Sequence, residues 1–322
     1  MMTDSNSKNI SYPSQFAILL GLTGGAIIIA SLATLAVWNM MTGLPFPTKT
    51  EDLLQSKFYN VNMVMQAVST FFIFFVPVHF FALICYKDPY HFLGFNARFN
   101  YRQIFLVIGI LILTFPLSGA LSELNKIIPI PKDWAIKFKA MELARQAQEA
   151  ALIHIDSIKK LLISLLVIAF LPAVFEETFF RGGLQNILTR WFKGPWAAII
   201  LTSIIFSLVH LSYYGFLVRF SLGLILGFIF YYSRNLWLNI LLHFLFNGVQ
   251  VIALYITTIA GVKDKKDLEA GFPLWAGALA IVLLIFLFKR FRTSSQIYLS
   301  KYLEQSVINN EDDLHNSTSN NY

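Results

Sequence analysis

The chain has 322 residues, of which 56% are hydrophobic and 13% are charged, and its formal net charge is +7. A soluble domain carries roughly 25% charged residues, so this composition excludes an ordinary water-soluble protein and predicts an integral membrane protein. The single cysteine, Cys85, excludes an internal disulfide and a thiolate metal cluster, and the excess of basic residues is expected at lipid headgroups rather than on a nucleic-acid surface.

Eight apolar segments approach or exceed the roughly 20 residues that a helix needs to cross a bilayer. They predict an all-α, polytopic membrane protein with about eight transmembrane helices and an intramembrane polar cavity. The expected spans are Phe16–Val37, Phe58–Tyr86, Ile104–Leu121, a segment from Leu161 through Phe175 and beyond, Trp196–Leu211, Phe216–Tyr232, Leu236–Ile259 and Phe272–Phe288. The second span is expected to bend near Pro77, and the fourth to continue as helix past its two glutamates, since no turn signal follows them.

Two further segments differ from the spans in composition. Pro131–Lys160 interleaves basic residues with apolar ones, a pattern that predicts an amphipathic helix lying in the membrane interface, with a solvated linker as the alternative. The tail from Thr293 onward is polar and poor in core residues, so it is expected to be disordered past about Val307.

Polar side chains gather inside three of the spans, within E-E-T-F-F-R, F-S-L-V-H and H-F-L-F-N. They are Glu176, Glu177, Arg181, His210, His243 and Asn247. A charged group in the middle of a spanning helix costs about 2.5–3.5 kcal/mol on insertion scales, so this cluster predicts a functional site. The alternative is that these groups only join helices by hydrogen bonds, which rarely requires a carboxylate, an arginine and two histidines together.

Helix geometry assigns these residues to different faces. Consecutive residues are about 100° apart, so Glu176 and Glu177 are expected to have different roles. Arg181 follows Glu177 by four residues, which predicts an ion pair that leaves Glu176 to point elsewhere. His243 and Asn247 are also four apart and project together, but counting from the helix starts places His243 and His210 at depths that differ by roughly 10 Å.

In this order on consecutive spans, the three motifs resemble those of the CPBP intramembrane proteases, the family of CAAX prenyl endopeptidases and bacteriocin-processing enzymes also called the Abi domain. The resemblance covers roughly Leu161–Ile259. It implies a helical core with a water-filled cavity and an endopeptidase that cleaves a peptide near the membrane surface. It also divides the chain into an N-terminal region of three spans and the interfacial segment (1–157), a CPBP/Abi-like catalytic core (158–260), and the last span with its polar tail (261–322).

The lack of H-E-x-x-H and the pairing of Glu177 with Arg181 favour hydrolysis without a metal, and the resemblance, carried over residue by residue, implies which residues perform it. The implied catalytic residues are Glu176, His210, His243 and Asn247, and the implied site-shaping residues are Glu177, Arg181 and Phe206. Glu176 would be the general base and His210 would hold the attacking water, while the imidazole and amide of the seventh span would stabilise the oxyanion.

Three alternatives remain open at this point. Glu176, His210 and His243 could ligate Zn²⁺ with an open fourth position, although the sequence lacks H-E-x-x-H. Buried acids and imidazoles also build the proton relays of transporters. A third reading is a non-catalytic protein that binds a peptide, as an immunity protein would.

Orientation in the membrane is expected from basic residues. The short loops favour termini in the cytoplasm, whereas the lysine-rich segment before the fourth span argues for the opposite arrangement. The expected location is the cell (inner) membrane with the cavity opening to the cytoplasm, and the expected partners are a peptide or protein substrate and the lipid bilayer, without nucleic acid.

Overall fold

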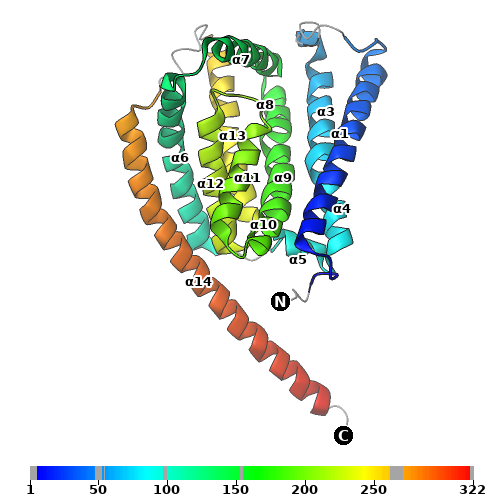
Figure 1. Ribbon diagram of the computed structural model, residues 1–322, viewed down its shortest axis with the longest axis vertical. Helices are drawn as coiled ribbons and strands as arrows, with labels where there is room; N and C mark the ends of the chain where they lie inside the picture. The colour runs from blue at the N-terminus through cyan, green and yellow to red at the C-terminus, as the bar shows by residue number, and fades with distance from the viewer. Residues whose placement is uncertain are drawn as a thin grey trace.

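The computed structural model is an all-α bundle of long, roughly parallel and antiparallel helices (Figure 1). It describes residues 6–47, 53, 55–96, 100–152, 155–261 and 271–319, with side chains except at 56, 148–152 and 301–319. Within these ranges, seven helical segments are long and apolar enough to cross a bilayer. They confirm the predicted all-α, polytopic membrane protein.

The seven spans follow the predicted segments closely. They are α1 (Tyr12–Thr42), α3 to α4 (Tyr59–Cys85), α6 (Tyr101–Ile127), α8 to α10 (Ile158–Trp191), α12 (Phe216–Ser233), α13 (Leu236–Ile259) and the part of α14 from Leu274 to Ser300. The expected eighth span is α11 (Pro195–Leu208), an apolar helix of 14 residues that is shorter than a full crossing. The chain turns at Leu211, whose φ is 50°, and returns directly into α12.

Two of the spans change helix type along their length. The second consists of α3 (Tyr59–Thr70), the π-helix η2 (Phe71–Phe75) and α4 (Val76–Cys85), with Pro77 in the first turn of α4. Proline lacks an N–H and clashes with the preceding turn, so a wider π turn just before it is the expected accommodation. The fourth span consists of α8 (Ile158–Ser164), η3 (Leu165–Phe170), α9 (Leu171–Glu177), η4 (Thr178–Gln185) and α10 (Asn186–Trp191), so helix does continue past the glutamates.

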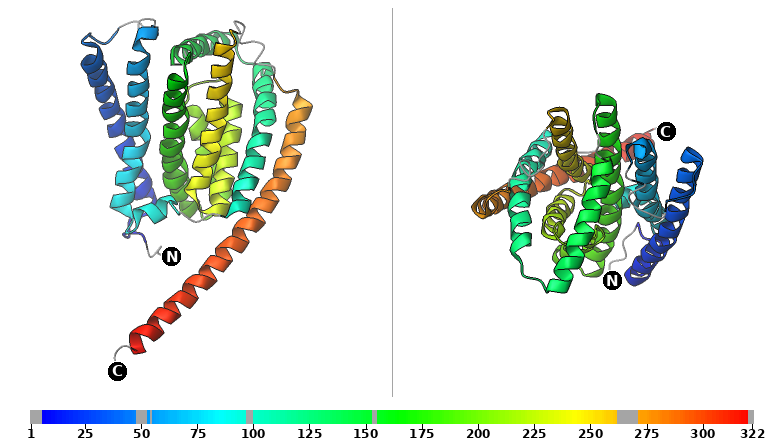
Figure 2. Two further views of the ribbon diagram at one scale, coloured as in Figure 1. Left: turned by 180° about the vertical axis from the view of Figure 1, so that it is seen from behind. Right: turned by 90° about the horizontal axis from the view of Figure 1, so that it is seen from above.

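The interfacial segment forms α7 (Lys132–Leu152), which lies across one end of the bundle (Figures 1 and 2). Both ends of the described chain lie at the opposite end. Short helix α5 (Pro89–Leu93) also lies there, after α4. The segment is therefore helical, and it is separated from the termini by the thickness of the bundle.

The last helix, α14 (Leu274–Ser319), is longer than its apolar part. Composition predicts disorder past Val307, but the structure continues the helix to Ser319. No proline occurs in this helix, and its one glycine, Gly277, lies in the first turn, so no residue in the sequence stops it. α14 packs along α6 and α12 and then extends beyond the bundle (Figure 1).

The buried residues form two large apolar clusters with polar groups between them. One cluster joins α1, α4, η4 and α11, and the other joins α6, α12, α13 and α14. Helix α12 approaches α11 closely through a G-x-x-x-G pattern: a Cβ at Gly223 would lie 3.0 Å from the Cα of Ser203, and one at Gly227 would lie 2.7 Å from Ile199. Small residues allow such backbone contact in membranes, and here they bring the carbonyls of α12 within reach of η4.

Candidate active site

Glu177 is the centre of a buried hydrogen-bond network. It is the last residue of α9, and its carboxylate accepts hydrogen bonds from Arg181 Nη1 at 2.6 Å, His243 Nδ1 at 2.9 Å and Asn239 Nδ2 at 3.3 Å. Glu177, Arg181 and Asn239 are fully buried, and His243 is 3% exposed. The predicted ion pair of Glu177 with Arg181 is therefore present, and it also holds the imidazole of α13.

Arg181 lies within the π-helix η4 and connects this network to two neighbouring helices. Its Nη2 donates to the carbonyl of Gly223 on α12 at 3.3 Å, and its guanidinium lies 4.7 Å from the ring of Phe206 on α11. The neighbouring Gln185 makes a similar bond, from Nε2 to the carbonyl of Gly227 at 2.9 Å. The glycines that allow close packing of α12 thus also expose the carbonyls that orient η4.

Asn239 is a site residue that the motif reasoning missed. Its amide donates to Glu177 and, at 2.7 Å, to the carbonyl of Leu226. It precedes His243 by four residues, as Asn247 follows it by four, so a polar stripe of spacing four along α13 was the available signal. The motif H-F-L-F-N begins at His243, so it does not include Asn239.

His210 lies just beyond the end of α11, where its Nδ1 is 2.7 Å from the carbonyl oxygen of Phe206. The ring of Phe206 is 5.1 Å from the ring of His210 and 6.0 Å from the ring of His243. Both imidazoles therefore lie next to one aromatic side chain, so the fold brings them near each other despite the depth difference expected from residue counting. Phe206 is 1% exposed, which fits its predicted site-shaping position.

The partners of the two imidazoles determine their tautomers. A carbonyl oxygen only accepts hydrogen bonds, so Nδ1 of His210 is the N–H donor. Glu177, paired with Arg181, is an ionised acceptor, so Nδ1 of His243 also carries its proton. In the neutral state each ring then has Nε2 left as an acceptor, a geometry that suits a group receiving a proton or a hydrogen bond from water.

Glu176 has an environment unlike that of its neighbour. It is 8% exposed, and within the described residues its carboxylate has no hydrogen-bond or ion-pair partner. Asn247 is half-buried, one turn beyond His243, and likewise has no hydrogen bond to a described residue. Glu176 and Asn247 are therefore the polar groups that the fold leaves available to a ligand.

The loop after His210 contacts the interfacial helix α7. Ser212 Oγ donates to Glu142 Oε2 at 2.8 Å, and the ring of Tyr213 stacks on Phe138 with centroids 4.9 Å apart. Burial alone would raise the pKa of Glu142, but hydrogen bonds from Arg145 and Ser212 outweigh it and lower the pKa below its ordinary value. Helix α7 is thus attached to the segment that carries one of the two site histidines.

The zinc hypothesis concerns Glu176, His210 and His243. Throughout the described part of the chain, no three His, Cys, Asp or Glu side chains are grouped as candidate metal ligands. Nδ1 of His243 is bound to Glu177, so only Nε2 of that ring would be available to a metal ion.

Comparison with known proteins adds one match. Residues 158–249 match the protein-family model described as Rce1-like, type II CAAX prenyl endopeptidase. The match spans the segment from the start of α8 to just past Asn247 and so includes all three motifs. No curated protein and no solved structure matches the chain.

Proposed function

We propose that this chain, whose residues 158–249 match the Rce1-like, type II CAAX prenyl endopeptidase family model, is an intramembrane endopeptidase. It hydrolyses a peptide bond near the membrane surface with a water molecule activated by a glutamate and a histidine. The observation that carries this proposal is the contrast between the two adjacent glutamates: Glu177 is fully bonded, while Glu176 beside it has no partner among the described residues and keeps some exposure.

In the first step Glu176 removes a proton from the attacking water. Nε2 of His210, left as an acceptor by the Phe206 carbonyl, accepts a hydrogen bond from the same water and orients it. The water oxygen attacks the peptide carbonyl carbon, and negative charge develops on the carbonyl oxygen. General-base catalysis of this kind contributes about 10²–10⁴-fold.

The developing oxyanion requires hydrogen-bond donors. The amide of Asn247 supplies one, and His243 supplies the second when its ring is protonated, because Nε2 then carries an N–H. The 2.9 Å bond from Nδ1 to Glu177 fixes the orientation of this ring, and Arg181 and Asn239 in turn hold the carboxylate in place. Loss of one such donor typically costs about 10²–10³-fold in rate. Glu176 then returns the proton to the leaving amine.

The experiment that tests this function compares membranes containing the wild-type protein with membranes containing Glu176→Gln or His210→Ala. The substrates are a farnesylated peptide ending in a CAAX sequence and, separately, the endogenous membrane proteins, whose new termini are identified by mass spectrometry. Both variants are expected to fold and to lose cleavage by about 10²-fold or more. The matched control, Glu123→Gln, removes an exposed carboxylate that pairs with Lys126 and is expected to cleave normally.

Cleavage retained by both site variants would refute the endopeptidase. If endogenous membrane proteins gain new termini but the farnesylated peptide is not cleaved, the endopeptidase proposal stands and a prenylated substrate is excluded. Metal dependence is measured on the same preparation: activity that persists after exhaustive chelation, with no zinc found by elemental analysis, ends the zinc alternative.

We also propose that the site opens at the α7 end and that this end faces the cytoplasm of the cell membrane. The loop of His210 contacts α7, and basic residues flank this end, among them Lys126, Lys137 and Lys160. Because both termini lie at the other end, a cytoplasmic opening places them outside, against the expectation from the short loops.

Cysteine labelling decides the orientation. In a Cys85→Ala background, Lys8→Cys is expected to react in intact cells with a thiol reagent that does not cross membranes, and Lys137→Cys only after permeabilisation. The reverse pattern would place the site opening outside.

A further inference from the structure

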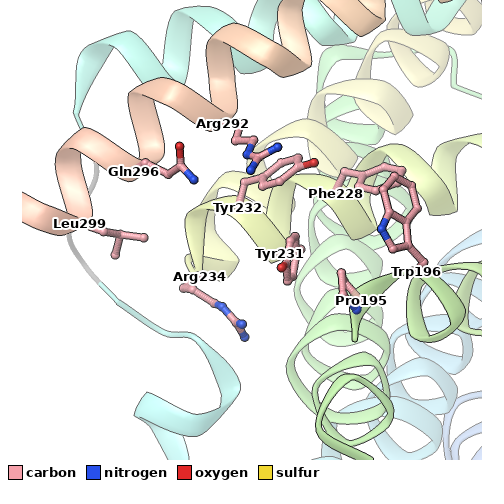
Figure 3. A pocket seen from close by; sticks show the side chains of 9 residues that line it. All are labelled: Pro195, Trp196, Phe228, Tyr231, Tyr232, Arg234, Arg292, Gln296 and Leu299. Carbon is pink, nitrogen blue, oxygen red and sulfur yellow. The ribbon is translucent and has the colours of Figure 1, made fainter. Parts of the chain in front are cut away.

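A cleft lies at the end of the bundle where α14 leaves it, far from α7. Its volume is about 390 Å³. It is formed by the start of α11, the end of α12 and the middle of α14 (Figure 3). The lining residues are Pro195, Trp196, Phe228, Tyr231, Tyr232, Arg234, Arg292, Gln296 and Leu299. Five of the nine are aromatic or proline, and none is acidic.

Two guanidinium groups in this cleft have no anionic partner among the described residues. Arg234 lies 5.5 Å from the ring of Tyr231, and Arg292 lies 5.9 Å from the ring of Tyr232. Within the described chain, neither side chain makes a hydrogen bond or an ion pair. The cleft therefore concentrates the positive charge of Arg234 and Arg292, for which the described residues supply no anionic partner.

The position of both arginines along their helices corresponds to the membrane boundary. Arg234 stands between the end of one span, at Ser233, and the start of the next, at Leu236. Arg292 is 18 residues beyond Leu274, which is about 27 Å along a helix and close to the hydrocarbon thickness of about 30 Å. Trp196 and the two tyrosines have the character of an interfacial aromatic belt. The open side of the cleft thus meets lipid headgroups.

We propose that this cleft binds the phosphate of an anionic phospholipid between Arg234 and Arg292. Guanidinium groups bind phosphate oxygens with paired, charge-assisted hydrogen bonds, and a low-dielectric boundary strengthens them. The acyl chains leave towards the hydrocarbon along Phe228, which lies six residues before Arg234 on α12, on the membrane side of the two arginines. The bound lipid bridges α12 to α14 at the point where α14 would otherwise separate from the bundle.

The proposal predicts that anionic lipid stabilises the protein through these two arginines. Purified full-length protein is reconstituted in nanodiscs of phosphatidylcholine alone or with phosphatidylglycerol, and its thermal unfolding is followed. Phosphatidylglycerol is expected to raise the midpoint of the wild type by several degrees, since a ligand that binds only the folded state stabilises it. The double variant Arg234→Gln/Arg292→Gln is expected to lose most of this shift.

Arg290→Gln is the matched control. It lies on the same helix and at the same membrane end, and its guanidinium also covers a ring, Phe286 at 5.1 Å, but it does not line the cleft. It is expected to keep the full shift. Equal shifts in the double variant and the control, or none in the wild type, would overturn the proposal, as would an equal shift produced by inorganic phosphate alone. If the double variant does not fold, Arg292→Gln alone is tested instead, because Arg292 is exposed. It is then expected to lose most of the lipid-dependent shift, and a full shift would overturn the proposal.

Discussion

The sharpest test of the network around Glu177 is the removal of Arg181. Arg181→Met keeps an unbranched apolar stem but deletes the ion pair at 2.6 Å, the bond to Gly223 and the stacking over Phe206. Both charged partners are fully buried, so the variant leaves the carboxylate in the interior without its cation. Breaking a buried pair in this way costs about 3–5 kcal/mol.

The double variant Arg181→Met/Glu177→Gln separates this penalty from the loss of packing. Replacing both members of a buried pair by neutral groups is often neutral, because the cost of desolvating two charges disappears along with their attraction. The Glu177→Gln change keeps a side-chain acceptor in place for the bonds from Asn239 and His243. The double variant is therefore expected to recover most of the stability that the single variant loses.

Both variants are compared by thermal unfolding in detergent micelles. At about 2 °C per kcal/mol, the single variant is expected to melt roughly 6–10 °C below the wild type, with the double variant between them and closer to the wild type. If the single variant has the same unfolding midpoint as the wild type, the ion pair with Arg181 does not stabilise the buried Glu177 carboxylate. A double variant that melts as low as the single would assign the loss to packing and refute the electrostatic reasoning.

Three further predictions concern packing, positioning and pH. Gly223→Ala is expected to destabilise by about 1–3 kcal/mol, because its Cβ would press on the backbone of Ser203, whereas Gly21→Ala, with open space around it, is expected to be neutral or stabilising in the same unfolding assay. Asn239→Leu is expected to cost about 1.5–3 kcal/mol and to slow cleavage, since it removes a hydrogen bond to a charged group; normal stability and cleavage would contradict this. The pKa of Glu142 is lowered, so its docking bond is present at neutral pH and is lost only as pH falls below the ordinary pKa of a glutamate and through the lowered one. Hydrogen exchange in α7 is expected to rise there in the wild type and to be high at every pH in Glu142→Gln. Equal exchange in both proteins would contradict it.

The spans could be predicted because hydrophobic length is a local property of the sequence. Seven of the eight expected segments contain helices long and apolar enough to cross a bilayer, and the change of helix type at Pro77 follows from local chemistry. The eighth segment, α11, is shorter than expected. Trp196–Leu211 reads as apolar throughout, but its helix ends at Leu208, and residues 209–215 form a turn. Such a turn is tolerated in a membrane where other protein covers it, and α7 provides that cover through Glu142 and Phe138.

The sequence predicts the hydrogen bonds of the candidate site that lie within one helix. It does not predict those that join different helices. The spacing of four identifies the pair of Glu177 with Arg181. Nothing in that spacing shows that the same carboxylate also receives His243, which is 66 positions away, or that Asn239 joins them. These contacts depend on the approach of α12 and α13 to η4, which in turn depends on glycines whose role is visible only once the helices are packed.

The two adjacent glutamates can fill two roles that one carboxylate could not combine: holding the partner side chains and remaining available to water. A carboxylate that holds an imidazole and a guanidinium in a dry interior is saturated with donors and is a poor base, because its lone pairs are occupied. A carboxylate left without donors is available to a water molecule but positions nothing. Placing the two side by side on a helix turns them about 100° apart, so Glu177 can organise His243 and Arg181 while Glu176 stays open in the same layer of the bundle.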